Sequence, residues 1–232
     1  MKEYSSLEKA YDDYLWEKRI GEQAERKEGI KGEVVHASEI PYCMRAIVLG
    51  MLGLSEWDRK QLKSVLRIFE NGKYFHDRMQ DALKAKGVLT RCEEFVYNEK
   101  FGIGGSIDGV ALLSGMDHIA EFKSMNSWGY GKNELPLDQH KMQASIYMFC
   151  SGIYKTRFMY ENKDNQGITE VTYALEEEML EAAIRRAREA WWWFRKTTDV
   201  SHPVLPPMEC LLKSDSKAKR CLTRKGCFNH VD

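Results

Sequence analysis

The sequence lacks any long hydrophobic segment. No apolar run approaches the roughly 18 residues that a membrane-spanning helix requires, and the opening stretch MKEYSSLEKAYDDYLWEK has no apolar signal-peptide core. These absences predict a cytoplasmic protein without a membrane partner. The chain also has no internal repeat and no low-complexity segment, so its 232 residues are expected to form one elaborated domain with a sizeable core.

The sequence also lacks net charge, because 35 Lys and Arg residues balance 35 Asp and Glu residues. This balance excludes attraction to nucleic acid or to a membrane surface through an overall field, so any polyanion must be held by a local patch. One such patch is LKSDSKAKRCLTRK, which has six basic residues and one acid. We expect phosphate contacts there, with Arg220 and Arg224 as candidate DNA-binding residues, although a flexible solvated tail is the alternative.

A disulfide framework is not expected although the chain has six cysteines, because such frameworks belong to secreted proteins. The cysteines are interpreted as reduced thiols or as ligands of a metal or cluster. Cys92 and Cys150 are expected in the core or in strands, since a lone cysteine packs as a small hydrophobe. Cys210, Cys221 and Cys227, by contrast, lie close together in the sequence.

Helical periodicity recurs along the chain. The segments that show it are 7–27, a stretch beginning at Ser38, 57–86, 137–153 and 176–196. The second helix is predicted to begin at Ser38 because Ser38 is a suitable N-cap, Glu39 falls in the first turn and Pro41 is early enough to be tolerated. The last helix carries an apolar stripe of Leu180, Ile184, Ala187, Trp191 and Phe194. Trp192 and Trp193 are left as surface candidates for base stacking.

The period changes to that of strands over residues 93–124. Three alternating or β-rich runs, separated by Asn, Gly and Ser turns, predict a β-meander. KTRFMYENK and ITEVTYAL are predicted to form a second strand pair about the turn DNQG. Tyr160 and Lys163, at the end of the first of these runs, are either DNA-facing residues or an ordinary strand-end aromatic and a solvated lysine.

Asp108, Glu121 and Lys123 are charged residues in two of the predicted strands. Glu121 and Lys123 are two residues apart and therefore share one face. A turn at Ser114-Gly115 places Asp108 opposite Glu121, and a longer turn from Ser114 to Asp117 places it opposite Lys123. Either register gathers the three charges on one face.

Two carboxylates that lie close together repel each other unless a cation neutralises them. Oxygen ligands suit a hard divalent ion, Mg²⁺ or Mn²⁺. Such an ion activates water and polarises a phosphodiester, while Lys123 can orient the water or stabilise the pentavalent charge. The residues therefore indicate phosphodiester hydrolysis. The alternative is a solvent-facing salt bridge from Lys123 to an acid, worth under about 1 kcal/mol.

The pattern GSIDGV…EFKS resembles the D-x(n)-E-x-K motif of the PD-(D/E)XK nucleases. Two further motifs resemble the RecB-like exonuclease branch of that family: G-x-x-x-H from Gly72 to His76, and Q-x-x-x-Y from Gln143 to Tyr147. The resemblance spans roughly Ser38 to Cys227. It implies an α/β fold with a restriction-endonuclease-like core, in which a central mixed β-sheet is flanked by α-helices.

The resemblance also assigns roles to individual residues. It implies metal binding by Asp108 and Glu121, with His76 as an additional ligand and the backbone carbonyl of Phe122 as a possible third. Lys123 would be the catalytic lysine. Gln143 and Tyr147, which share one helix face, would position Lys123 or bind DNA phosphate. Lys163 and Arg45 are further candidate DNA contacts.

RecB-like nucleases that carry an iron–sulfur cluster use one upstream cysteine and three near the C-terminus. Cys43, in PYCMR, occupies the place of the first, and Arg45 matches the usual C-x-R. Cys210, Cys221 and Cys227 supply the other three and would clamp the domain around a [4Fe–4S] cluster. Because the spacing from Cys210 to Cys221 is longer than the common C-x2-C, a Cys₄ zinc site and ordinary thiols remain alternatives.

The sequence is thus expected to fold as one RecB-like nuclease domain over 1–232, with a helical part over 1–90, a catalytic part over 91–175 and a long helix and basic tail over 176–232. The expected activity is metal-dependent DNA exonuclease activity, on single-stranded ends, in phage or bacterial recombination, repair or CRISPR adaptation. Expected partners are DNA and recombination or helicase proteins. The alternatives are a DNA-binding subunit that does not cut, a zinc-stabilised binding module, and an endonuclease or junction resolvase.

Overall fold

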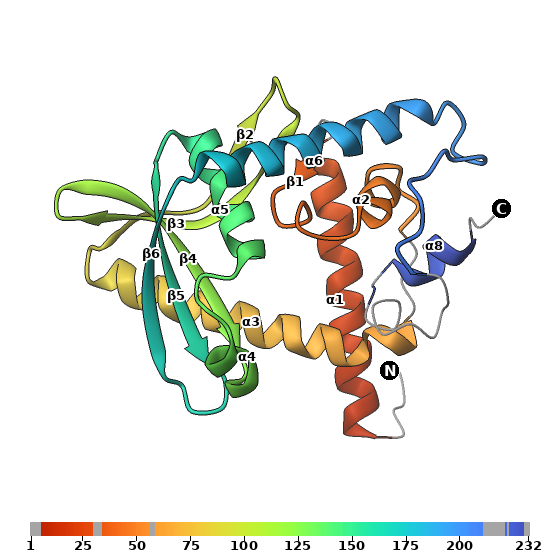
Figure 1. Cartoon of the computed structure of the whole chain (residues 1–232). Helices are drawn as coiled ribbons and strands as arrows, with labels where there is room; N and C mark the ends of the chain where they lie inside the picture. The colour runs from red at the N-terminus through yellow and green to blue at the C-terminus, as the bar shows by residue number, and fades with distance from the viewer. Residues whose placement is uncertain (1–5, 30–33, 56–58, 211–220, 222, 230–232) are drawn as a thin grey trace.

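The computed structural model describes residues 6–29, 34–55, 59–210, 221 and 223–229. Its centre is a mixed β-sheet (Figure 1). The strands are β1 (Val35–His36), β2 (Leu89–Asn98), β3 (Ile103–Leu113), β4 (Met116–Met125), β5 (Lys155–Asn162) and β6 (Ile168–Ala174). They lie in the order β1-β3-β4-β5-β6, with β2 also paired to β3. Parallel pairing joins β1 to β3 and β4 to β5, and the remaining pairs are antiparallel.

Helices flank this sheet on both faces (Figure 1). They are α1 (Leu7–Gly29), α2 (Met44–Met51), α3 (Arg59–Ala85), α4 (Ser127–Lys132), α5 (Asp138–Ser151), α6 (Glu177–Lys196) and α8 (Arg224–Asn229). The main core joins α2, α5 and α6 to the sheet, and a second core joins α3 to β2, β3 and β4. This arrangement confirms the expected α/β fold with a central mixed sheet. None of the described helices is both long and apolar enough to cross a membrane.

The predicted β-meander is confirmed by the antiparallel strands β2, β3 and β4, and the predicted pair about DNQG by β5 and β6. Ser114 and Gly115 form the two-residue turn between β3 and β4, with Leu113 paired to Met116. Both turn residues have positive φ, 51° and 78°, which suits the right-handed twist of a two-residue hairpin. The shorter of the two predicted turns is therefore the one that forms, and its register carries Asp108 to the position opposite Glu121.

The helix predicted to begin at Ser38 is wrong in its start. Val35 pairs with Ile103 of β3, and the N–H of Ala37 continues the pairing to Gly104. The chain then turns, and α2 begins only at Met44, with Cys43 at its N-cap. Residues 37–41 form turns between β1 and α2, so the local capping signals at Ser38 favoured a helix start where the chain turns away from the sheet.

Candidate active site

Asp108 and Glu121 lie where β3 separates from β4. Backbone pairing between these strands ends at Gly109 and Ala120, and the two carboxylates engage the backbone just beyond. The N–H of Phe122 donates to Asp108 Oδ2 (2.7 Å), and the N–H of Asp108 approaches Glu121 Oε1 (3.4 Å). Lys123 Nζ donates to Glu121 Oε2 (2.8 Å). The structure thus brings the three charges together at the end of one ladder.

Burial makes the electrostatics of this group strong. Only 1% of the Glu121 side chain is exposed, and burial together with the charge of Asp108 raises the pKa of Glu121 to about 7. Burial also opposes ionisation of Asp108, but the hydrogen bond from His76 and the charge of Lys123 outweigh it and hold the pKa of Asp108 below its usual value. Burial opposes the charge on Lys123 too, yet Glu121 and Asp108 raise its pKa. The site therefore holds Lys123 and Asp108 charged and makes Glu121 the costly ion.

His76 reaches Asp108 from α3, on the other side of the carboxylate. Its Nδ1 lies 3.2 Å from Asp108 Oδ1, and its ring packs edge-on against Phe122. Burial lowers the pKa of His76, but the hydrogen bond with Asp108 and the charge of that carboxylate outweigh burial and raise it. The imidazole predicted from the G-x-x-x-H pattern therefore does lie at the carboxylates.

Gln143 and Tyr147 lie on α5, which packs against the sheet. Gln143 Nε2 donates to the Tyr147 hydroxyl (2.8 Å). Tyr147 is buried, with 3% of its surface exposed, and burial and the charge of Glu121 raise its pKa well above the ordinary value. The pair therefore lies beside Glu121, with Gln143 satisfying the buried hydroxyl.

His140 is a site residue that the sequence reasoning missed. It lies one turn before Gln143, and its Nδ1 is 2.8 Å from the hydroxyl of Tyr160. Burial and the charge of Lys123 lower the pKa of His140 to about 3, so the ring is neutral beside the lysine. Tyr160 is opposite Lys123 in the register of β4 and β5 and is fully buried. Tyr160 is thus a buried partner of His140 at the site and is not a surface residue.

Gln80 was also missed. It lies one turn after His76 on α3, and its Nε2 donates both to the backbone carbonyl of Asp108 (2.9 Å) and to Glu93 Oε1 (2.7 Å). The side chain therefore fixes the strand position that carries the carboxylate. The i, i+4 spacing from His76 was the available signal, but glutamine alone is too common in helices to be distinctive.

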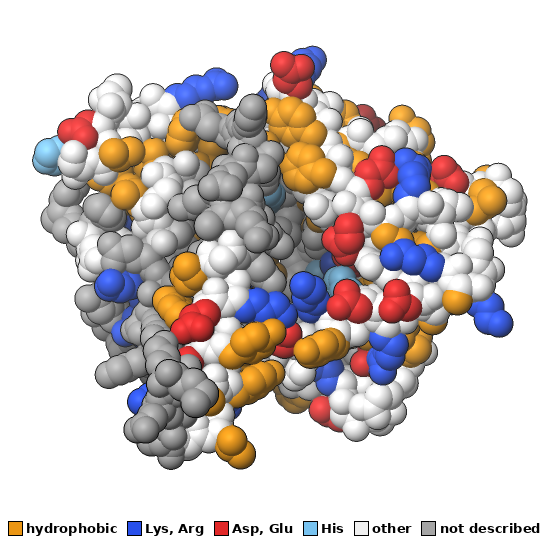
Figure 2. All heavy atoms as spheres, turned by 180° about the vertical axis from the view of Figure 1, so that it is seen from behind, with side chains coloured by type: hydrophobic (Ala, Val, Ile, Leu, Met, Phe, Trp, Pro, Cys, Tyr) orange, Lys and Arg blue, Asp and Glu red, His pale blue; other side chains and the backbone are white. Residues whose placement is uncertain are grey.

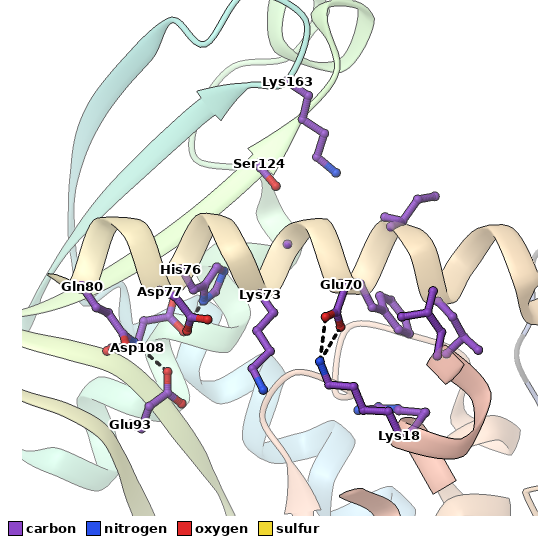
Figure 3. Close-up of a pocket in the computed structure, with 16 residues that line it drawn as sticks. Lys18, Glu70, Lys73, His76, Asp77, Gln80, Glu93, Asp108, Ser124 and Lys163 are labelled. Carbon is purple, nitrogen blue, oxygen red and sulfur yellow. Dashed lines mark hydrogen bonds and ion pairs between the residues drawn. The ribbon is translucent and has the colours of Figure 1, made fainter. Parts of the chain in front are cut away.

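A cleft of about 870 Å³ opens at Asp108 and His76. Figure 3 shows His76 and Gln80 projecting from α3 towards Asp108 and Glu93. Its charged lining mixes four bases with four acids: Lys18, Arg19, Lys73, Lys163, Glu70, Asp77, Glu93 and Asp108. Lys163, a predicted DNA contact, is exposed and lies in this lining. The cleft therefore offers basic side chains close to the carboxylates.

Helix α1 supplies one wall of the cleft. Lys18 donates to both oxygens of Glu70 on α3 (2.7 and 2.9 Å), as Figure 3 shows. Further along α1, Asp12 is buried and lies against Arg67 and Lys63, with Arg67 Nε donating to it at 2.9 Å. Ion pairs thus hold α1 along α3, where the apolar contact is limited to a small cluster around Leu15 and Leu66.

The predicted cluster residues lie away from this cleft. Cys43 caps α2, Cys221 precedes α8 and Cys227 lies within it, and α2 and α8 contact each other. Burial raises the pKa of Cys227, Arg45 opposes this rise, and Cys221 and Cys210 add to it. Cys43, Cys221 and Cys227 thus belong to or flank two helices that contact each other. None of the six cysteines takes part in a disulfide.

The remaining predicted DNA contacts lie in different parts of the chain's structure. Arg45 is buried, and its Nη1 donates to the carbonyl of Pro206 (2.8 Å), so the structure gives it a packing position outside the cleft. Arg224 begins α8 and is half-buried. Arg220 lies outside the described residues, with most of the basic segment around it.

The donor set at the carboxylates fits a hard divalent cation in its chemistry. Asp108 and Glu121 supply carboxylate oxygens, Phe122 a carbonyl and His76 an imidazole nitrogen. A cation would relieve the repulsion that raises the pKa of Glu121. As they stand, no three His, Cys, Asp or Glu side chains in the described part of the chain are arranged to hold a metal ion. Lys123 contacts Glu121 and His76 contacts Asp108 instead, so a cation that binds these carboxylates would have to displace the two contacts.

Comparison with known proteins shows the fold. No family model matches the chain, and no curated protein matches it. Among solved structures, SSO0001 is similar with a TM-score of 0.55 at 18% identity, covering 82% of this chain and 89% of that one. An alkaline exonuclease from Laribacter hongkongensis is similar with a TM-score of 0.50 at 13% identity, covering 71% of this chain and 89% of the exonuclease. The chain therefore shares a restriction-endonuclease-like nuclease fold with these proteins.

Proposed function

We propose that this protein is a metal-dependent deoxyribonuclease of the RecB-like branch, which hydrolyses DNA from a free end and prefers single strands. The observation that carries the proposal is the meeting of Asp108, Glu121 and Lys123 with His76 at the end of a cleft. A salt bridge on a solvent-facing surface would not bury Glu121 to 1% exposure. Burying two carboxylates and a lysine is costly, and catalysis is a function that justifies this cost.

The residues divide the work of hydrolysis between them. Water oxygen bonds to phosphorus, the bond to the leaving oxygen breaks, and the protons of water pass to the leaving oxygen and to solvent. Lys123, held charged by its neighbours, donates to the phosphoryl oxygens as negative charge develops there. Asp108, Glu121, the Phe122 carbonyl and His76 would hold Mg²⁺ or Mn²⁺, which supplies Lewis-acid polarisation and an activated water.

The surrounding residues keep this group in position. Gln80 fixes the backbone at Asp108, and the neutral ring of His140 lies beside Lys123 without competing for its negative partners. Tyr147 closes the buried side of Glu121. Lys163 and Lys73 in the cleft would contact the phosphates on either side of the bond that is cut.

Cleavage of end-labelled linear DNA, single-stranded and duplex, tests the proposal beside closed circles in Mg²⁺ and in Mn²⁺. The wild type should degrade linear DNA only when a divalent ion is added, and the label gives the polarity. Lys123→Ala should lose at least about 100-fold in rate, because it removes a group that stabilises transition-state charge. Lys155→Ala is the matched control, since Lys155 is an exposed lysine at the start of β5 that does not line the cleft.

Circular dichroism and thermal unfolding of each variant separate lost chemistry from lost fold. Cleavage by a folded Lys123→Ala protein at the wild-type rate would contradict the role of that lysine. Digestion of closed circles would identify an endonuclease or junction resolvase instead. If the folded wild type binds DNA but cleaves no substrate, with or without a divalent ion, the protein would be a subunit that binds DNA and does not cut it.

We also propose that Cys43, Cys210, Cys221 and Cys227 bind a [4Fe–4S] cluster. The contact between α2 and α8, and the proximity of Cys227 to Cys221 and Cys210, support the proposal. Thiolates are the ligands that such a cluster requires. Metal and sulfide analysis of protein purified without oxygen tests it: about four iron and four sulfide per chain are expected, whereas one zinc without sulfide would establish a zinc site. Cys43→Ser should lower the bound iron, while Cys92→Ser, at an unrelated thiol, should not.

The biological setting proposed here is recombination, repair or CRISPR adaptation in a phage or bacterium, with helicase or recombination proteins as partners. The sequence motifs favour it. A DNA end supplied by a helicase or a break would be the substrate of such an enzyme.

A further inference from the structure

A second groove, of about 730 Å³, lies between the tip of the β2–β3 hairpin and the C-terminal half of α6. It is separate from the catalytic cleft in its lining. Four basic side chains line it against one acid, Glu99, and they are Lys100, Arg188, Arg195 and Lys196. Aromatic rings line it as well, among them Tyr97, Phe101, Trp191 and Trp192. The groove thus combines an excess of positive charge with aromatic rings.

The basic groups and the rings are arranged in pairs. Lys196 Nζ lies 3.5 Å from the centre of the Trp192 ring, and Arg188 Cζ lies 5.1 Å from that of Phe101. None of the four basic side chains forms an ion pair with an acidic residue among those that the structure describes. Their charges are therefore available to an anion. Trp192 is 51% exposed, so its ring is accessible as well.

The exposed face of β2 joins this groove to the catalytic cleft. Glu93 lines the cleft and Tyr97 lines the groove. Phe95 lies between them in the strand, and the side chains of all three residues are exposed. The rings of Phe95 and Tyr97 are stacked, with centres 6.5 Å apart and planes at 21°, and both are more than 40% exposed. Figure 2 shows large hydrophobic side chains exposed at the top of the molecule, where Figure 1 places this hairpin.

The path has a length that suits a few nucleotides. Tyr97 pairs with Gly104 of β3, four residues before Asp108, which is about 13 Å along a strand. A stacked single strand advances about 3.4 Å per nucleotide, so about four nucleotides would span it. Gly104 has no side chain, and a Cβ there would lie 3.2 Å from the Tyr97 ring. The Tyr97 ring therefore lies close to Gly104.

We propose that Phe95, Tyr97 and the groove at α6 form a binding track for single-stranded DNA, which holds the strand that leads to or from the catalytic cleft. The inference rests on the proposed nuclease function and adds to it where the strand is held. Rings with open faces stack on bases of any sequence, and unpaired cations contact the phosphates between them. A duplex keeps its bases stacked inside and could use only the cations, so the aromatic rings favour a single strand.

Binding of fluorescent oligothymidylate, measured by anisotropy in EDTA, tests the track without cleavage. Trp192→Ala/Lys196→Ala removes one stacking ring and one phosphate contact, and should weaken binding of an oligomer of about 15 nucleotides at least about ten-fold. An oligomer of about three nucleotides is too short to reach from the catalytic cleft to the groove. The ratio of the affinity for the longer oligomer to the affinity for this short one should therefore be smaller in the variant than in the wild type. Trp192→Phe, which keeps a ring, should restore most of the affinity.

The matched control is Tyr154→Ala/Lys155→Ala. These neighbours are an exposed ring and an exposed lysine at the start of β5, and they line neither the cleft nor the groove. Wild-type affinity of the groove variant for the longer oligomer would overturn the inference. Equal competition by polyglutamate of matched charge would also overturn it, because the groove would then be a site for acidic peptides.

Failure of this inference and failure of the proposed function give different results. If groove variants lose affinity but the wild type cuts no DNA in any metal, the track stands and the nuclease function is wrong. If the wild type cuts DNA and the groove variant binds and cuts as the wild type does, the nuclease function stands and the track is wrong.

Discussion

Replacement of Glu121 by Gln should abolish metal-dependent cleavage and yet make the metal-free protein more stable at neutral and alkaline pH. The carboxylate is buried, and burial together with Asp108 raises its pKa from 4.5 to about 7. Glutamine keeps the shape of the side chain and an oxygen that can accept from Lys123. It removes a buried charge and the repulsion of that charge by Asp108, which together cost free energy in the absence of a cation.

The magnitude follows from proton linkage. Below pH 4.5 the carboxyl is protonated in both the folded and the unfolded chain, so its stabilising effect is fully present. As the pH rises to about 7 the unfolded chain ionises first, and the folded state loses up to about 3 kcal/mol at about 1.4 kcal/mol per pKa unit. The Glu121→Gln variant would escape this loss, and the pKa of about 7 already includes the charge of Lys123 and its hydrogen bond to Glu121. The net gain in the free energy of unfolding above pH 7 is therefore up to about 3 kcal/mol.

Thermal unfolding of wild type and Glu121→Gln in EDTA, followed by circular dichroism from pH 4 to 8, measures this difference. The two midpoints should approach each other at acid pH. Above pH 7 the variant should unfold up to about 6–12 °C higher, since 1 kcal/mol corresponds to about 2–4 °C in a chain of this size. Mn²⁺ should raise the midpoint of the wild type and leave that of the variant nearly unchanged, because only the wild type keeps both carboxylates.

Two results would refute this reasoning. A variant less stable than the wild type at every pH would show that the Lys123–Glu121 ion pair outweighs the repulsion from Asp108. An equal rise of both midpoints with Mn²⁺ would show that the cation binds elsewhere. Gln143→Ala is the control, because it alters a side chain of the site without removing a charge, and its effect on the midpoint should not vary over the same pH range.

Two other predictions concern the scaffold. Gly104→Ala should lower the free energy of unfolding in urea by about 2–3 kcal/mol, since a Cβ there would lie 2.3 Å from the Val96 carbonyl oxygen. The control is Gly131→Ala, because no heavy atom lies within 4 Å of the added Cβ. Equal stability of the two variants would contradict the close approach at Gly104. Burial alone would raise the pKa of Asp12, but the hydrogen bonds and charges of Arg67 and Lys63 hold it below 3.8. The stability that Asp12 contributes is therefore present above that pH and lost as the pH falls through the lower folded value. The unfolding temperature of Asp12→Asn should lie below that of the wild type at neutral pH, and this difference should shrink in acid. A difference that stays constant with pH would show that the ion pairs contribute nothing.

Much of the site was predictable because it depends on local periodicity. The alternation of a strand places Glu121 and Lys123 on one face, and the Ser-Gly pair between β3 and β4 favours a two-residue turn, which fixes the partner of Asp108. Gln143 and Tyr147 follow in the same way from the repeat of a helix. These residues carry their spacing in the sequence itself.

Other parts of the site depend on packing between distant segments. Nothing local indicates that His140 lies beside Lys123, or that α1 forms a wall of the cleft through Lys18 and Glu70. The misplaced helix start at Ser38 has a related origin, since Val35 pairs with Ile103 of the distant strand β3 and the turns at 37–41 that follow this pairing delay the helix to Met44. The role expected of Arg45 also changed with packing, because its guanidinium is buried against the Pro206 carbonyl.

The sequence by itself determined the kind of fold, the order of its main elements and the residues that we propose for phosphodiester hydrolysis, because those follow from side-chain type and short-range periodicity. The tertiary structure alone decided how costly those charges are. Burial to 1% exposure and the approach of Asp108 set the pKa of Glu121, and the crossing of α6 over the β2–β3 hairpin made a basic, aromatic groove in a chain without net charge. Dielectric surroundings and the meeting of distant surfaces are properties of the folded chain, and no local pattern encodes them.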